Sequence, residues 1–281
     1  CLSVGRTVVS DCFERAEAAK QMSKITAVMA IIPILCFIFG GLLAEFFGWR
    51  YNLAALGSIS FILIIFMLWV LEETLINKAE TISFLNMFQV YKNLIKNSLF
   101  RLFTITTAMQ TSMFFAMNGF MPYEFSRQGV SVSEFGMWFS LTSMGYIVGN
   151  IINGKFGSKI GLEKMCLIGT IFSLFTVFLM FLNTYLGIYG PLSLSLICVL
   201  FGCSNGFTVA NSMTGAINSS KLNKGAASGL MGAFQVGLGG LAGFLIIYFG
   251  GAEDFYVCLL ALIIMSSISI ISAFFILANK D

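Results

Sequence analysis

The sequence predicts an all-α protein that crosses a lipid bilayer several times. Hydrophobic residues make up 58% of its 281 residues and charged residues only 10%, with a mean hydropathy of +0.90. Soluble domains usually carry about 25% charged residues, so a water-soluble fold would not hide this much apolar surface. Apolar runs of about eighteen or more residues recur along the chain, and each is long enough to cross a hydrocarbon core of about 30 Å as a helix.

The hydropathy pattern predicts the end of one span followed by about eight full spans. The partial span covers residues 1–10, and a charged loop at 11–20 follows it. The full spans lie near 22–44, 52–71, 101–121, 134–153, 165–183, 191–213, 226–249 and 255–278. The short alternating segments typical of a membrane barrel are absent from this sequence.

The first full span contains two features that change how a helix packs. Pro33 removes a backbone donor and tends to kink the helix. Gly40 and Gly41 remove side-chain bulk, so that a neighbouring helix can approach closely. Both an ordinary spanning helix and a bent helix in a moving bundle fit this pattern.

The longest hydrophilic connection separates the second and third full spans. Its apolar residues between 82 and 95 recur at roughly helical spacing, which predicts a helix lying on the membrane surface. A solvated linker helix is the alternative. The connection divides the chain into a remnant of an N-terminal six-helix half at 1–72, a linker at 73–98 and a C-terminal six-helix half at 99–281.

The distribution of Lys and Arg predicts the orientation in the membrane. Of the 16 basic residues, all except Arg50 and Arg127 fall on one set of alternate loops and ends. Because cytoplasmic loops carry the excess of basic residues, this set is expected to be cytoplasmic. It includes the loops near 11–20, 73–98, 154–164 and 215–224.

The composition argues against several kinds of chemistry. The absence of histidine removes Ser-His-Asp catalysis, His-ligated haem and most zinc sites. The seven cysteines contain no C-x-x-C pair, and no phosphate-binding G-x-x-x-x-G-K-[ST] motif occurs. We therefore expect no enzyme activity, no catalytic or metal-binding residues, no cofactor and no nucleic-acid partner.

Six short motifs follow one another along the chain. They are RTVVSD at 6–11, PILCFIFGG at 33–41, GWR at 48–50, LEETL at 71–75, GKFGSKIG at 154–161 and GAASGL at 225–230. Together they resemble the helix ends and loops of the major facilitator superfamily and, within it, the Bcr/CflA drug-resistance (bicyclomycin-resistance-like) group. The resemblance begins within that family's fourth helix, so the chain is expected to be an N-terminally truncated member, a partial major facilitator bundle.

Two motifs depart from the family pattern. The fifth-helix antiporter motif commonly has Gly-Pro or Ala-Pro where this chain has Cys36 and Phe37. The second-half loop motif lacks its Asp-Arg pair and has Lys155 and Phe156 instead. The first departure puts the antiporter geometry in question.

The resemblance implies a central substrate cavity between the two halves. The spans that would line it are also those with polar residues inside, and the amides are the best candidates because a buried amide without a partner costs about 1–3 kcal/mol. The predicted cavity residues are Met29, Cys36, Met109, Gln110, Met113, Asn205, Phe207, Phe234 and Gln235. For each of them, an interhelical hydrogen bond or ordinary packing is the alternative.

Further residues are candidates for conformational roles. Pro33, Gly40, Gly41, Gly225 and Gly229 are expected at close helix contacts. A cytoplasmic charge network is expected to include Arg6, Asp11, Glu14 and Arg15, with a solvated charged loop as the alternative. Glu124 is expected near the periplasmic end of its helix, reaching water, with proton coupling as a weaker interpretation.

By resemblance, the protein is expected to be a secondary active transporter of a bacterial inner membrane. It would be a monomer in the lipid bilayer that exports drug-like small molecules by alternating access, with protons as its other partner and the proton gradient as its energy source. One alternative is an importer or exchanger of metabolites on the same fold. Another is an inactive product of a truncated gene.

Overall fold

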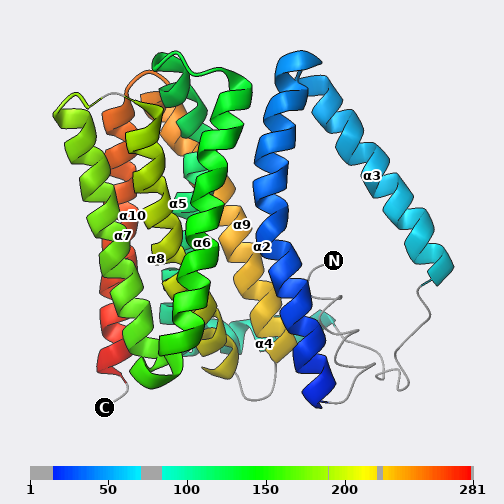
Figure 1. Ribbon diagram of the computed structural model, residues 1–281. Helices are drawn as coiled ribbons and strands as arrows, with labels where there is room; N and C mark the ends of the chain where they lie inside the picture. Colours follow the sequence, from blue (N-terminus) through cyan, green and yellow to red (C-terminus); the bar gives the residue numbers. More distant parts are fainter. Residues whose placement is uncertain (1–14, 71–83, 189, 220–223, 280–281) are drawn as a thin grey trace. The chain divides into compact units, whose positions relative to one another are not determined.

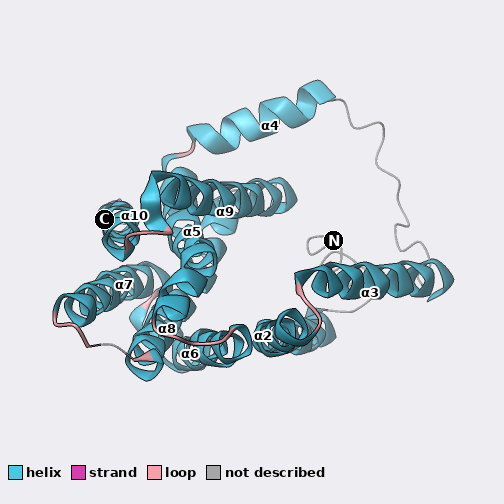
Figure 2. Cartoon of the chain, turned by 90° about the horizontal axis from the view of Figure 1, so that it is seen from above, coloured by secondary structure: helices cyan, strands magenta, loops and turns pink. Residues whose placement is uncertain are grey.

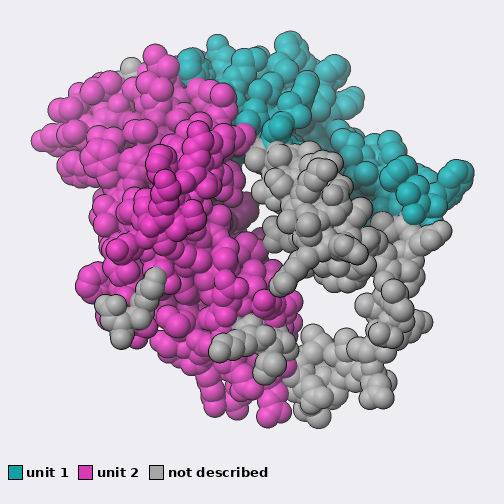
Figure 3. All heavy atoms as spheres, turned by 60° about the horizontal axis from the view of Figure 1, so that its bottom comes forward, with its two compact units in different colours: residues 1–83, 131–140 teal, residues 84–130, 141–281 magenta. Residues whose placement is uncertain are grey.

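The computed structural model describes residues 15–70, 84–188, 190–219 and 224–279, with side chains described from residue 31 and, after the first gap, from residue 88. Over these ranges the chain is helical and contains no strand. It divides into two compact units (Figure 3). The first contains helices α2 and α3 with residues 131–140, and the second contains the other described residues.

The first unit is built on a helical hairpin (Figure 1). Helix α2 spans Arg15–Phe46 and α3 spans Trp49–Val70. Gly48 makes the turn between them with a φ of +92°, a conformation that glycine adopts without strain. Asn52 Nδ2 donates to the Gly40 carbonyl at 3.0 Å and ties the two helices together near this turn.

The second unit is a helical bundle whose members lie side by side (Figure 1). In order they are α4 (Phe84–Lys96), α5 (Ser98–Arg127), α6 (Val132–Ile160, whose first residues belong to the first unit), α7 (Leu162–Tyr185), α8 (Pro191–Ser219), α9 (Lys224–Ile246), the π-helical turn η1 (Ile247–Gly251) and α10 (Phe255–Ala278). Asn97 and Asp254 cap α5 and α10, and their side-chain oxygens accept from Phe100 N and Tyr256 N.

Helix α5 forms the centre of the second unit. It packs against α8, α9 and α10, and the end-on view of Figure 2 shows it among them. Half of its 30 residues are buried. The helix therefore places its polar side chains inside protein rather than lipid, which removes the cost of exposing them to hydrocarbon.

Helix α4 runs across the bundle at the end where α5 begins (Figures 1 and 2). Leu94 is buried in a cluster with Phe100, Phe103 and Met231, and Val90 and Tyr91 pack against the same cluster. The apolar face of α4 thus lies on the bundle, while Phe88, Lys92 and Lys96 are exposed. The division of the chain into halves at this helix stays a prediction.

Three of the expected loops are shorter in the structure. Residues 15–20 belong to α2, residues 154–160 belong to α6, and residues 215–219 belong to α8. Gly161, with a φ of +94°, is the single residue between α6 and α7. Charged residues continue these helices because a helix end beyond the membrane core tolerates them, so hydropathy alone placed the helix ends too early.

Six helices of the described residues are long and apolar enough to cross a membrane: α3, α6, α7, α8, α9 with its π turn, and α10. Helix α5 is long enough but more polar, and the described side chains of α2 include a shorter apolar stretch, Ile31–Phe46. The expected count of about eight full spans is therefore not confirmed. The partial span at 1–10 lies outside the described residues.

Candidate functional site

The polar face of α5 holds the first predicted cavity residue. Gln110 is fully buried, and its Nε2 donates to Ser269 Oγ of α10 at 3.4 Å. Gln110 therefore makes an interhelical hydrogen bond, which is the alternative to a cavity role given above. Its Oε1 is buried and remains as an acceptor without a partner among the described residues.

Hydroxyl groups join the part of α5 that precedes Gln110 to two neighbouring helices. Thr107 Oγ1 donates to Ser212 Oγ of α8 at 2.6 Å. Ser272 Oγ of α10 donates to the Leu102 carbonyl at 2.8 Å. Through these short hydrogen bonds, α5 makes polar contacts with both α8 and α10. The hydropathy profile does not predict which hydroxyl groups form pairs.

Three other predicted cavity residues lie within helix packing. Met113 on α5 is fully buried. Asn205 on α8 is 5% exposed, and its Nδ2 donates to the Phe201 carbonyl one turn earlier at 3.4 Å. Phe207 stacks on Phe172 of α7 with ring centroids 6.1 Å apart.

The structure brings two predicted cavity residues, Met109 and Phe234, into one pocket between α5 and α9. The pocket has a volume of about 230 Å³ and is lined almost wholly by apolar atoms. Its other lining residues are Ile95, Phe100, Arg101, Thr104, Ile105, Ala108 and Leu238. Sequence reasoning missed Arg101 and Thr104, because only the contact of α5 with α9 places them beside Phe234.

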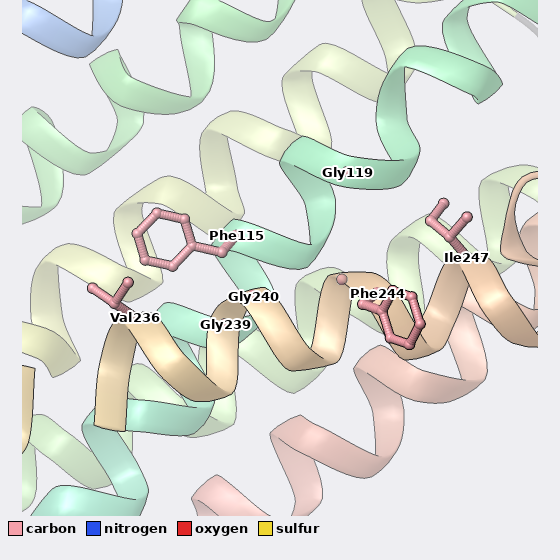
Figure 4. Close-up of a pocket in the computed structure, with 8 residues that line it drawn as sticks. Phe115, Gly119, Val236, Gly239, Gly240, Phe244 and Ile247 are labelled. Carbon is pink, nitrogen blue, oxygen red and sulfur yellow. The ribbon is translucent and has the colours of Figure 1, made fainter. Parts of the chain in front are cut away.

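A second, wider groove lies further along the same pair of helices (Figure 4). It has a volume of about 490 Å³, and glycines of both helices form its floor. The ring of Phe115 lies over Gly239, where an added Cβ would be 2.6 Å from Phe115 Cδ2. Phe115 therefore fills the space that Gly239 leaves, and Val236 and Phe244 border the groove.

Three predicted cavity residues remain, Gln235, Cys36 and Met29, and neither Gln235 nor Cys36 lines the two pockets described above. Gln235 on α9 is half-buried, and its Nε2 is buried without a partner among the described residues. Cys36 on α2 is exposed. The side chain of Met29 lies outside the described residues. Cys36 and Met29 belong to the first unit and the other seven to the second.

Close backbone contact occurs at Gly41 but not at every predicted glycine. A Cβ on Gly41 would lie 2.9 Å from the Val132 carbonyl oxygen, and a Cβ on Gly136 would overlap the Phe37 carbonyl. Helix α2 and the start of α6 thus meet through small residues, with Pro33 one turn before Phe37. Among the described residues, nothing lies within 4 Å of a Cβ built on Gly40, Gly225 or Gly229, so the expected contacts there are not found.

Glu124 does not reach water as expected. It is 7% exposed, and Arg127 Nη1 donates to Oε2 at 2.6 Å while Gln128 Nε2 donates to Oε1 at 3.1 Å. Arg127 also donates through Nη2 to the Ala252 carbonyl at 2.7 Å, next to η1. Arg127 and Gln128 at the end of α5 give the buried carboxylate two donors, and the bond from Arg127 to Ala252 ties α5 to the turn after α9.

The predicted charge network lies outside the part of the chain that can be assessed. Arg6, Asp11 and Glu14 precede the described residues, and the side chain of Arg15 is not described. A charge contact that sequence reasoning missed is made by Glu45, which follows the predicted span 22–44. Its Oε2 accepts from Ser133 N at 2.7 Å in the first turn of α6. This bond lowers the pKa of the Glu45 carboxyl below its usual 4.5, because it favours the ionised form.

Comparison with known proteins identifies the family. The family model described as Major Facilitator Superfamily matches residues 1–244. The chain belongs to the major facilitator superfamily. It is therefore an integral membrane protein of a transporter family, as the motifs and the apolar helices indicated.

Two curated relatives match most of the chain. The chain is 24% identical over 248 residues to a "Bicyclomycin resistance protein homolog" of Haemophilus influenzae, and 26% identical over 245 residues to the "Uncharacterized MFS-type transporter YdgK" of Bacillus subtilis. Each match covers 85% of this chain and 60% of the relative. The chain thus spans about 60% of the length of these relatives. The name of the Haemophilus influenzae relative agrees with the expected similarity to the bicyclomycin-resistance group.

Proposed function

We propose that the protein acts in proton-coupled efflux of drug-like small molecules by alternating access, in a bacterial inner membrane. Family membership supports transport. The name of the Haemophilus influenzae relative supports a role in drug resistance. The proton gradient is the proposed energy source, and the protein works as a monomer with protons and a small-molecule substrate as its partners.

The unsatisfied amide atoms carry this proposal. Gln110 Oε1 and Gln235 Nε2 are both buried without partners among the described residues, on two helices that pack against each other. Such an atom costs about 1–3 kcal/mol unless it gains a partner. A substrate that offers hydrogen bonds to these amides recovers this free energy, which gives a transporter site its selectivity.

The close contact of α2 with the start of α6 supports the conformational part of the proposal. Gly41 and Gly136 bring the two helices together without interlocking side chains. Smooth contacts of this kind allow helices to shift against each other during alternating access. Glu124 is the proposed but weaker candidate for a proton-binding group, since its protonation would release Arg127.

The proposal is tested in cells that lack their major exporters and express the protein from its native gene. Energised efflux of a fluorescent cation should stop when a protonophore collapses the proton gradient. Gln235→Ala should slow efflux at least about fivefold, because it removes a substrate contact worth about 1 kcal/mol. Ser267→Ala is the control, since Ser267 Oγ donates within its own helix, to the Ile263 carbonyl.

Two results would count against the proposal. Accumulation of substrate by energised cells would identify an importer or exchanger on the same fold. Absence of both uptake and efflux, with the protein correctly inserted and tested on several substrates, would favour an inactive gene product.

A further inference from the structure

Basic residues lie at and beside the pocket between α5 and α9. Arg101 lines the pocket, whereas Lys92 and Lys96 lie on α4, whose Ile95 also lines it. We call these three residues the basic rim. All three side chains are exposed, and Lys92 and Lys96 lie one turn apart on α4. Arg101 Nη1 donates to the Ile95 carbonyl at 3.3 Å, which holds the guanidinium at the pocket mouth.

Among the residues that the structure describes, no carboxylate balances the charge of this rim. The sequence has no Asp or Glu between residues 81 and 123. Among the described residues, no carboxylate lies within ion-pairing distance of the three basic groups. Arg101 can therefore give charge-assisted hydrogen bonds to an anion bound at the pocket, and Lys92 and Lys96 add positive charge on α4.

The pocket behind the rim has the opposite character. Its wall consists of Phe100, Ile105, Met109, Phe234 and Leu238 with Ala108, and it exposes almost no polar atoms. Its volume of about 230 Å³ is below the roughly 300–1,000 Å³ of pockets that bury a whole drug-sized ligand. The space therefore suits one apolar arm of a ligand whose polar group stays outside.

We propose that this pocket binds an amphipathic anion, with an apolar chain between α5 and α9 and the anionic group at the basic rim. The apolar chain is stabilised by about 25 cal/mol for each Å² of surface that it removes from water. The anionic group selects for charge. The proposal concerns binding, so it stands or falls independently of the efflux assay above.

A pair of probes that differ only in charge tests the proposal on the purified full chain. The probes are dansyl-labelled undecanoic acid and its methyl ester, and their fluorescence reports entry into an apolar site. We expect the acid to bind about tenfold more tightly than the ester, and its affinity to fall as salt is added. Equal affinity for the two probes would overturn the proposal.

Variants locate the site. Lys96→Gln with Arg101→Gln should remove the preference for the acid and leave the ester unaffected. Lys155→Gln with Lys159→Gln is the matched control, because both lysines are exposed at the end of α6 and line none of the pockets described here. A similar loss in the control would show that the preference is non-specific attraction and would contradict the proposal.

A third variant tests the apolar arm. Ile105 is 39% exposed and lines the pocket, so Ile105→Trp fills the pocket from its open side without changing a buried core residue. It should weaken the acid and the ester equally, by about tenfold. Unchanged binding of both probes would place them elsewhere and would overturn the assignment to this pocket.

Competition between the dansyl-labelled acid and lipid vesicles distinguishes a bilayer lipid from a soluble anion as the natural ligand. Displacement of the acid by phosphatidylglycerol but not by phosphatidylcholine would identify a bilayer lipid as the occupant. Displacement by neither, with binding retained, would identify a soluble amphipathic anion. Both results support the proposed chemistry, whereas equal displacement by the two lipids would contradict the requirement for charge.

Discussion

Helices α3 and α5 show opposite relations between polarity and burial. Helix α3 is among the most apolar of the described helices, with a hydropathy of 2.5, and it has no buried residue. Helix α5 carries threonines, serines and Gln110, and half of its residues are buried. In a membrane protein an apolar surface can face lipid without cost, whereas a polar side chain must find a partner inside the protein.

The difference explains how α5 can be more polar than α3 although both are predicted spans. Its hydroxyl groups bond to α8 and α10 through Thr107, Ser212 and Ser272. The neighbouring helices therefore account for the polar side chains of a helix that the sequence predicts as a span. Substitutions should then have large effects in and around α5 and small effects in α3.

The largest expected effect comes from bulk added to the bundle around α5. A Cβ on Gly202 of α8 would overlap the Thr142 carbonyl of α6, whereas none of the described residues lies within 4 Å of a Cβ on Gly57 of α3. Gly202→Leu should destabilise the protein by about 3 kcal/mol or more, and Gly57→Leu by less than about 1 kcal/mol. Thermal unfolding can be measured by a thiol-reactive dye that labels Cys166, Cys198 and Cys203 once unfolding exposes these buried thiols.

The next effect comes from removing side-chain volume. Met113 on α5 is fully buried and Met67 on α3 is half exposed. Met113→Ala should cost about 2–3 kcal/mol through the cavity that it leaves, and Met67→Ala should cost less than about 1 kcal/mol. Equal shifts of the thermal midpoint in the two variants would contradict the conclusion that α5 is buried and α3 is not.

A smaller effect is expected from a single interhelical hydrogen bond. Thr107→Val keeps the shape of the side chain but removes the 2.6 Å bond to Ser212 Oγ. The expected cost is about 1 kcal/mol, since such bonds contribute little more than this in membrane bundles. Ser60→Ala in the exposed part of α3 is the matched control, and its thermal midpoint should not change.

The smallest effect is expected from Glu45, whose charge is exposed. Its pKa is lowered below 4.5 by the bond from Ser133 N, so the ionised form stabilises the start of α6 at pH values above 4.5. This contribution is lost as the pH falls through the lowered pKa. The thermal midpoint of Glu45→Gln should therefore decrease less than that of the unsubstituted protein as the pH is lowered below 4.5. Identical dependence of the two midpoints on pH would contradict the contact between Glu45 and Ser133.

Sequence reasoning predicted the class of fold and the position of most helices, because about twenty apolar residues between charged ends leave little choice in a bilayer. It also predicted a helix between the second and third full spans, and it predicted the family. It placed helix ends too early at 154–160 and 215–219, because charge does not end a helix that leaves the membrane.

The roles of single site residues stay predictions, because they depend on packing that the sequence does not specify. A polar residue in a span must face protein, but the sequence does not say which neighbour it meets. Gln110 meets Ser269, while Met109 and Phe234 meet across a pocket, and no spacing within α5 distinguishes the two cases. Arg101 and Thr104 were missed because their importance depends on the packing of α5 against α9.

Proton coupling is the central feature of the proposed transport, and substrate-induced proton movement tests it most directly. The protein would be reconstituted in sealed vesicles that contain a pH-sensitive dye, with an imposed proton gradient. Addition of a transported compound should accelerate the collapse of the gradient, and Gln235→Ala should reduce that response. Transport of the compound without any movement of protons would contradict the proposed mechanism.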